Sequence, residues 1–414
     1  MKKLTCVMLA AVLLTVFTAF AGCGGKPKLT LYAAGYERNS DEVNVAMVWK
    51  IDGSKVTPIA LTDGTQNVEV WGIAESGNSI YVAGYEGSEG NSDHFYSAIT
   101  VWKIDGSKVT SIALTDGTQK AMVQGIAEIG DSLYAAGWEM NGGINIATVW
   151  KIDGSTVTPI ALTDETQYGV VNDIAEIGGS LYATGDEGLA ATVWKIDGST
   201  VTPITQINGR RSSHVRAQGI AEIGGGIYVT GSEGSGVLQD DAMVWKIDDS
   251  TVTLIARING KPDAGTVGVA AGGGSLYAGG FNRGAYEGTA MVWKIDGSTV
   301  TPIVLPEGSQ SSGVRSIAEI GGSIYAIGSK YKVWKIDGST VTAIALTDET
   351  QKAEVYIYDM VESEGSLYAA GFEKNSNEVN VATVWKITDG ETTPIPLTEG
   401  DQNSNVKAVL ARME

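Results

Sequence analysis

Aromatic and acidic side chains occur together directly after a Tyr-x-x-Gly motif that the chain repeats eight times. Aromatic faces stack on sugar rings or peptide side chains, and carboxylates accept hydrogen bonds from hydroxyl or ammonium groups. One interpretation is a ligand-binding rim, and the other is that the rings cover strand ends. The aromatic pairs are Tyr36-Glu37, Tyr85-Glu86, Trp138-Glu139 and Phe372-Glu373. The other copies carry Asp186-Glu187, Ser232-Glu233, Phe281-Asn282 and Ser329-Lys330.

A second acidic set lies a few residues before six of the eight Tyr-x-x-Gly motifs. Carboxylates gathered around a channel mouth raise one another's pKa or recruit a hard cation such as calcium. No metal is expected, because the ligand spacing of a single calcium loop is missing. The alternative is that these side chains extend into water or pair with the lysine of the repeat. The set is Glu75, Glu128, Glu176, Glu222, Glu319 and Glu362, with Ala271 in the sixth copy.

Three loop segments alternate oxygen-bearing side chains: residues 39–42, 91–93 and 375–378. They faintly resemble calcium-binding loops but lack the fixed glycine and the distal bidentate glutamate. Turn formation by Asn and Asp explains them at least as well.

A basic island stands out against the acidic chain. It consists of Arg210, Arg211, His214, Arg216, Arg257 and Lys261. Such a group either contacts an anion or an acidic partner, or balances nearby acids.

Catalysis has little support in the residue types. The chain has two histidines, His94 and His214, and contains no Gly-x-Ser-x-Gly, His-x-x-x-His or phosphate-loop motif. We therefore expect no enzyme activity and no catalytic residue. A carbohydrate-active hydrolase or lyase is the less favoured alternative, since it would need only carboxylates and tyrosines.

The elements that position these residues follow a repeat whose marker is Val-Trp-Lys-Ile. Spacings of 41 to 53 residues between its tryptophans suit a four-stranded propeller blade. In the third copy the expected strands, A to D, are residues 123–128, 132–137, 147–152 and 156–162. Glycine-containing junctions between A and B and between C and D predict tight antiparallel hairpins. The tryptophans are Trp49, Trp102, Trp150, Trp194, Trp245, Trp293, Trp334 and Trp385, and they are expected to fill the space between blades rather than to bind ligand.

The two ends of the repeat region are complementary. The first copy begins at strand B, residues 29–35, and the chain ends in an unpaired A strand, residues 406–413. If the last strand completes the first blade, the ring closes without free edges. The prediction is an all-β, eight-bladed propeller over residues 29–414 with four-stranded antiparallel blades. The variable B–C and D–A loops lie on one face, here called the distal face, where binding is expected.

The first residues form a separate segment. Lys2 and Lys3 precede an apolar run, residues 4–20, that is followed by Ala-Gly-Cys23. This is typical of a bacterial lipoprotein signal peptide over residues 1–22, with Cys23 as the lipidated new N-terminus. Residues 23–28 would be a short lipidated tether that holds the propeller near its membrane. Cys6 lies in the leader, so the mature chain would have no disulfide.

The chain is acidic, with a formal net charge of −19. Lys2 and Lys3 are the only charged residues of the expected leader, so the mature chain would be more acidic still. This charge disfavours nucleic acid and anionic lipid surfaces as partners.

The repeat Gly-Ile-Ala-Glu-Ile-Gly-Gly-Ser-Leu-Tyr-Ala-Ala-Gly, followed by Ala-Thr-Val-Trp-Lys-Ile-Asp-Gly-Ser, resembles bacterial extracytoplasmic β-propeller repeat families. It is more distantly similar to quinoprotein-like and kelch-like propellers. The resemblance implies the fold and little of the function, because such propellers serve many functions. The sequence departs from this repeat pattern at Asp249, Thr388 and Ala271.

The function expected from these observations is a lipid-anchored, non-catalytic binding module of the bacterial cell envelope, at the outer membrane or cell surface. Its partner would be a protein or a glycan at the distal face, with no cofactor. The alternative is an envelope-assembly scaffold, similar in architecture to the outer-membrane assembly propeller lipoproteins.

Overall fold

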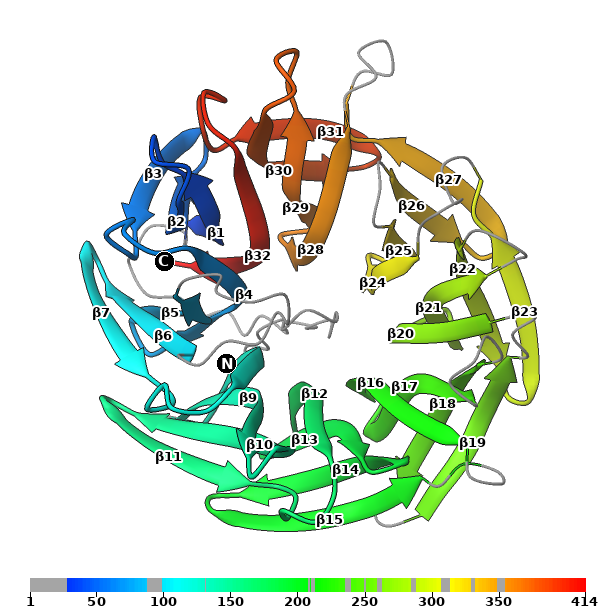
Figure 1. Cartoon of the computed structure of the whole chain (residues 1–414). Coiled ribbons are helices and arrows are strands. Elements are labelled where there is room, and N and C mark those ends of the chain that lie inside the picture. The colour runs from blue at the N-terminus through cyan, green and yellow to red at the C-terminus, as the bar shows by residue number, and fades with distance from the viewer. Residues whose placement is uncertain are drawn as a thin grey trace, which may run out of the picture.

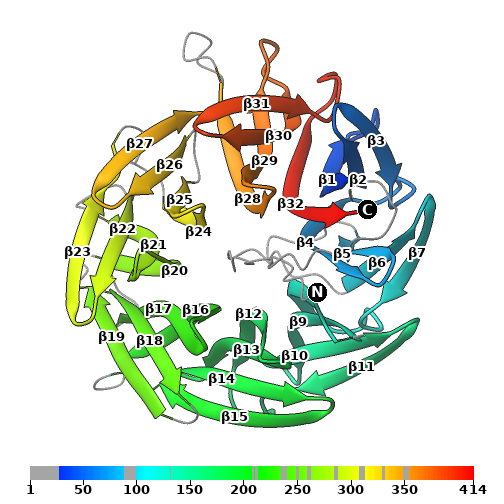
Figure 2. The same cartoon turned by 180° about the vertical axis from the view of Figure 1, so that it is seen from behind.

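Hairpins at glycine-containing turns generate the whole architecture. The computed structural model describes residues 28–87, 99–130, 132–207, 209, 213–234, 240–248, 251–258, 263–283, 288–306, 313–328, 332–347 and 354–414. Cys23 and the leader therefore lie outside the described residues. The strands form eight four-stranded antiparallel sheets arranged in a ring, as Figures 1 and 2 show from opposite sides. The predicted eight-bladed propeller is confirmed.

The strands of blades 1 to 4 are given from the channel outward. Blade 1 has β32 (Ser404–Met413), β1 (Leu29–Arg38), β2 (Asn44–Asp52) and β3 (Lys55–Ala60). Blade 2 has β4 (Val68–Ser76), β5 (Ser79–Glu86), β6 (Ile99–Asp105) and β7 (Lys108–Ala113). Blade 3 has β8 (Ala121–Ile129), β9 (Ser132–Asn141), β10 (Ile144–Asp153) and β11 (Thr156–Ala161). Blade 4 has β12 (Gly169–Ile177), β13 (Ser180–Glu187), β14 (Ala190–Asp197) and β15 (Thr200–Ile207).

Blades 5 to 8 follow the same order. Blade 5 has β16 (His214–Ile223), β17 (Gly226–Gly234), β18 (Asp241–Asp248) and β19 (Thr251–Ile258). Blade 6 has β20 (Asp263–Gly272), β21 (Ser275–Arg283), β22 (Gly288–Asp296) and β23 (Thr299–Val304). Blade 7 has β24 (Val314–Ile320), β25 (Ser323–Gly328), β26 (Lys332–Asp337) and β27 (Thr340–Ala345). Blade 8 has β28 (Val355–Ser363), β29 (Ser366–Lys374), β30 (Asn380–Thr388) and β31 (Glu391–Pro396).

The last strand closes the ring by pairing with the first. β32 runs antiparallel to β1, with Leu29 opposite Met413 and Glu37 opposite Ser404. The backbone amide of Lys28 donates to the Glu414 carbonyl at 2.8 Å, and the Glu414 amide donates back at 2.9 Å. The red and blue strands of Figure 1 meet in this blade. Because both strands have a partner on this side, neither leaves a free edge here.

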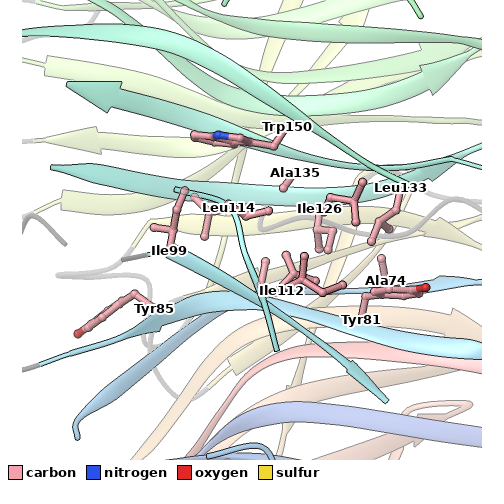
Figure 3. Close-up of a cluster of buried hydrophobic side chains, with 14 of the residues drawn as sticks. Ala74, Tyr81, Tyr85, Ile99, Ile112, Leu114, Ile126, Leu133, Ala135 and Trp150 are labelled. Carbon is pink, nitrogen blue, oxygen red and sulfur yellow. The ribbon is translucent and has the colours of Figure 1, made fainter. Parts of the chain in front are cut away.

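The repeated tryptophans pack between neighbouring blades. Trp150 is fully buried and lies opposite Ala135 on one side and Pro159 on the other. The small alanine leaves room for the indole, which joins an apolar cluster shared by blades 2 and 3. Figure 3 shows Trp150 and Ala135 on one side of this cluster and Tyr81 and Tyr85 on the other. The structure places these indoles where a packing role requires them.

A glycine in each Tyr-x-x-Gly motif permits a close approach of the two inner strands. A Cβ on Gly137 would lie 1.9 Å from the Met122 carbonyl oxygen, which no side chain could tolerate without backbone movement. Beside this glycine the pairing of β8 with β9 shifts register between Val123 and Gly125. The glycine thus accommodates a β-bulge in the innermost strand.

Candidate functional site at the innermost strands

Every innermost strand carries one such bulge, and its extra residue is of seven different types around the ring, with glutamine occurring twice. In blade 8, for example, the pairing passes from Ile357 to Asp359 and leaves Tyr358 without a partner in register. None of these residues is buried, and their strands line the central space of the ring (Figure 1). From blade 1 to blade 8 the bulge residues are Lys407, Trp71, Gln124, Asn172, Gln218, Val267, Arg315 and Tyr358.

Three bulge residues from neighbouring blades contact one another. Their residue types do not recur at this position in the other blades. The guanidinium carbon of Arg315 lies over the Tyr358 ring, 5.6 Å from its centroid. Lys407 Nζ lies over the same ring at 4.2 Å. Lys407 Nζ is also 3.8 Å from Glu69 Oε1 on β4. Four consecutive blades, 7, 8, 1 and 2, therefore contribute to one site.

Two further aromatic residues extend this group. The rings of Tyr356 and Phe372 stack with centroids 4.9 Å apart, and Phe372 is 6.3 Å from Tyr358. We call the set of Glu69, Arg315, Tyr356, Tyr358, Phe372 and Lys407 the aromatic–cation cluster. Each cation over an aromatic ring contributes on the order of 0.5–2 kcal/mol, depending on how far it is desolvated.

The cluster lies in the distal half of the channel. The D–A loop of the distal face enters β28 at Val355, and Tyr358 follows within four residues, whereas the A–B hairpin leaves the strand at Ser363. Leu29 and Met413, at the two ends of the described chain, pair at the hairpin end. The cluster therefore faces away from the end at which the described chain starts.

Most of the aromatic rim residues expected to bind ligand are buried. Tyr85, Trp138 and Phe372 are 5%, 3% and 7% exposed, and Tyr36 is half-buried. Burial raises the pKa of the Tyr36 hydroxyl, and a hydrogen bond with Asn405 opposes that shift. These positions match the interpretation in which the rings cover strand ends. Only Phe372 among these aromatic residues is part of the aromatic–cation cluster, and a ligand-binding role for the rim aromatics stays a prediction.

The four rim glutamates, Glu37, Glu86, Glu139 and Glu373, lie in similar electrostatic environments. Partial burial raises the pKa of Glu37, Glu86, Glu139 and Glu373 above the ordinary value. Neighbouring acids add to the shift in the first three: Glu399, Asp63 and Asp116 respectively. Desolvation and like charge thus act in the same direction. Their role in ligand binding also stays a prediction.

Three members of the second acidic set cap hairpins. Glu319 and Glu362 accept hydrogen bonds from the amides of Gly322 and Gly365, at 2.6 and 2.9 Å. Glu128 accepts from the amide of Gly77 in the preceding blade at 3.2 Å. Across the described residues, no group of three or more His, Cys, Asp or Glu side chains is placed to hold a metal ion.

The lysine of the repeat pairs with an aspartate of its own strand. In blade 3 Lys151 Nζ pairs with Asp153 Oδ2 at 3.0 Å, and blades 2 to 7 all show the same pairing of lysine with the hairpin aspartate. Pairing of this lysine with the second acidic set was one of two alternatives, and in these blades the lysine pairs with the hairpin aspartate. Residues two apart in a strand share a face, so the aspartate is the nearer acid.

Two of the three loops that resemble calcium sites are turns. Asn39 Oδ1 accepts hydrogen bonds from the backbone amides of Asp41 and Val43 at 3.0 and 2.9 Å. The side-chain Nδ2 of Asn39 donates to the Gly64 carbonyl. Asn375 makes the equivalent bonds in blade 8. These are turn interactions of asparagine. Residues 91–93 lie outside the described residues.

The described part of the basic island combines charge balancing with one exposed cation. Arg257 Nη1 is 2.8 Å from Asp241 Oδ2, and Arg257 Nη2 also contacts Glu233. Burial, followed by the charge of Arg216, lowers the pKa of His214. Arg216 is exposed. Arg210, Arg211 and Lys261 lie outside the described residues, as do Ser329, Lys330 and His94.

Asp186 gives the propeller a predicted pH dependence. This rim residue is 6% exposed and accepts a hydrogen bond from the Ala217 amide at 3.2 Å. Burial raises its pKa to about 6, against 3.8 for the free side chain. The folded state keeps a proton that the unfolded state loses, so stability falls as pH rises from about 4 to 6. Asp186→Asn is expected to flatten this fall and to add up to about 3 kcal/mol at pH 7.

Urea unfolding at pH 4.5 and pH 7 measures the difference. The control is Asp197→Asn, whose side chain is 57% exposed, and it should change the pH dependence little. An equal pH dependence in wild type and Asp186→Asn would contradict the assignment.

Comparison with known proteins supports the fold. No protein-family model matches the chain, and no curated protein matches it. Among solved structures, BamB from Moraxella catarrhalis is similar with a TM-score of 0.51 and 10% identity, over 81% of this chain and 92% of that one. AztD from Citrobacter koseri gives 0.49 and 10% identity, over 93% and 98%. The β-propeller domain of the trilobed protease from Pyrococcus furiosus gives 0.49 and 14%, over 81% and 96%. At these identities the likeness to BamB supports a β-propeller and carries no statement about function.

Within the described part of the chain, no helix has the length and apolar character needed to span a membrane.

The aromatic–cation cluster escaped the sequence prediction. Of its members, only Phe372 was among the predicted site residues. Arg315, Tyr358 and Lys407 occupy the bulge position, whose residue type varies inside an otherwise regular strand. The signal in the sequence was the variable residue three positions before the repeated Ala-Glu of strand A, at Trp71, Gln124 and Arg315.

Proposed function

We propose that this chain is a non-catalytic binding module that holds a protein partner at the distal mouth of its channel, through the aromatic–cation cluster. The observation that carries the proposal is the set of contacts among Arg315, Tyr358 and Lys407, which come from three different blades. Repeated positions elsewhere serve packing and turns. A group that departs from the repeat and is held by adjoining blades has the features of a binding site on a rigid scaffold.

The residue types support a protein partner. Tyrosine and arginine are the side chains over-represented where binding energy concentrates in protein interfaces. Tyr358 is half-buried and Arg315 is exposed, so both have surface that a partner could cover.

Site-specific cross-linking tests the proposal. A photoreactive phenylalanine analogue replaces Tyr358 in the full chain, and the matched control carries it at Thr158, which is exposed on the outer strand β11. We expect a discrete adduct with one protein from position 358 and none from position 158. Adducts at 158 alone, or none at either position, would contradict a protein partner at the cluster.

The proposal includes export and lipid attachment at Cys23, with the partner in the cell envelope. An envelope-assembly scaffold is the alternative that uses the same surface. The support is the leader, residues 1–22, with its charged start and apolar run.

Detergent-phase partition measures the attachment. Wild type and Cys6→Ala are expected in the detergent phase, and Cys23→Ala in the aqueous phase, because only Cys23 would carry the acyl chains. Retention of Cys23→Ala in the detergent phase would show that lipid at this residue is not the anchor.

A further inference from the structure

The two cations of the aromatic–cation cluster are under-compensated for so acidic a chain. Arg315 is exposed, and among the residues that the structure describes no carboxylate forms an ion pair with it. Lys407 has Glu69 at 3.8 Å, which is a loose pair. The chain as a whole carries a formal charge of −19. Within the described residues, positive charge is therefore concentrated at a place where Glu69 is the one carboxylate paired with it.

Tyr358 holds these cations together. Like charges repel, but both lie over one aromatic ring, whose negative face offsets part of the repulsion. Arg315 and Lys407 come from strands on either side of β28, so the ring organises the charges of three blades.

Guanidinium and ammonium groups together fit a carboxylate. The planar guanidinium donates two parallel hydrogen bonds to a carboxylate, and the ammonium adds a compact charge. Sugar binding would favour an uncovered aromatic face. Here cations lie over Tyr358, and Phe372 stacks on Tyr356, so the cluster presents charge more than an open aromatic platform.

We infer that the aromatic–cation cluster binds the carboxylates of an acidic peptide segment of the partner protein. The inference rests on the proposed function and adds the chemistry of the ligand. Glu69 acts as an internal substitute for the ligand carboxylate at Lys407, and the bound segment displaces it. Removing the charge of Glu69 therefore strengthens binding, whereas removing either cation weakens it.

Fluorescence anisotropy with defined peptide pools tests the inference. One labelled pool of about twelve residues is rich in Asp, Glu, Phe and Leu, and its matched pool has Asn and Gln in place of the acids. The full-length protein is expected to bind the acidic pool at least tenfold more tightly. Arg315→Ala and Lys407→Ala should each weaken that binding about tenfold, equivalent to roughly 1.4 kcal/mol. Glu69→Gln should strengthen it several-fold.

The control is Arg216→Ala, which removes an exposed arginine from the innermost strand of blade 5, away from the cluster. It should bind like wild type, and thermal unfolding confirms that all variants are folded. Equal affinity for the two pools, or an equal loss in Arg216→Ala, would overturn the inference. Tighter binding of an oligouronate that is lost in Arg315→Ala would overturn it in favour of a glycan.

Failure of the inference is distinguishable from failure of the proposed function. Cross-linking at position 358 could yield a protein adduct while the two pools bind equally. This result would support the proposed protein-binding site and contradict the acidic ligand. If no adduct forms at position 358, the proposed function itself fails.

Discussion

Deletion of residues 404–414 is expected to abolish the cooperative unfolding transition of the propeller. The deletion removes β32, which pairs with β1 along its length. It also removes four buried apolar side chains, Val406, Ala408, Val409 and Leu410. The three larger ones each contribute about 1.5–3 kcal/mol. A folded domain has only about 5–15 kcal/mol of net stability. The loss therefore approaches the whole, and the exposed edge of β1 favours aggregation.

A buried carboxylate adds to the contribution of the closing strand. Asp359 of β28 is 2% exposed, and its two oxygens accept from the amides of Met360 and Val409 at 2.8 and 2.9 Å. Deletion removes the hydrogen bond from the Val409 amide, which contributes about 0.5–3 kcal/mol more. Circular dichroism and differential scanning calorimetry measure the outcome.

The matched control is a circular permutant that keeps every residue from 28 to 414. Joining residue 414 to residue 28 by a short glycine turn places β32 before β1, in the same order as the A–B hairpin of the other blades. The reciprocal hydrogen bonds of Lys28 and Glu414 show that these residues are adjacent. The permutant is expected to unfold within a few degrees of wild type. A deletion variant as stable as the permutant would show that ring closure does not carry this stability.

The propeller follows from the sequence because its strongest constraints recur in every blade. The repeated indole lies opposite an alanine in six blades, as in Trp150–Ala135 and Trp385–Ala369, and opposite a valine in the other two. The unmatched strands at the two ends then predict closure. Positions that recur in every blade therefore reveal the packing of the fold. They reveal little about positions whose residue type varies from blade to blade.

The candidate site could not be predicted in the same way. Trp138 has a residue type suited to ligand binding, yet it is 3% exposed, because the fold packs it against other side chains that are distant in sequence. Arg315, Tyr358 and Lys407 have ordinary local sequences, and their meeting depends on the ring closing and on a bulge in each strand. The bulge is a matter of hydrogen-bond register, which a hydrophobic pattern does not encode.

The bulges that create the site depend on glycines in the neighbouring strands. At Gly371 a Cβ would lie 1.8 Å from the Tyr356 carbonyl oxygen and 2.8 Å from its carbon. Those atoms are backbone, so no rotamer change relieves the contact, and β28 must move away from β29. Gly371→Ala is expected to destabilise the propeller by roughly 3 kcal/mol or more. It should also displace Tyr356 and Tyr358, and binding at the aromatic–cation cluster should fall with stability.

Two glycine variants separate these effects. At Gly87 a Cβ meets nothing within 4 Å, so Gly87→Ala should be neutral or stabilise by about 0.4–1 kcal/mol through the unfolded state. Gly137→Ala creates the same backbone clash in blade 3, away from the cluster. It should match Gly371→Ala in urea unfolding but retain peptide affinity at a temperature where both are folded. If Gly371→Ala is as stable as Gly87→Ala, the close approach that permits the bulge is not a constraint. If Gly137→Ala loses affinity as severely as Gly371→Ala, the loss reflects the whole ring rather than the bulge that positions Tyr358.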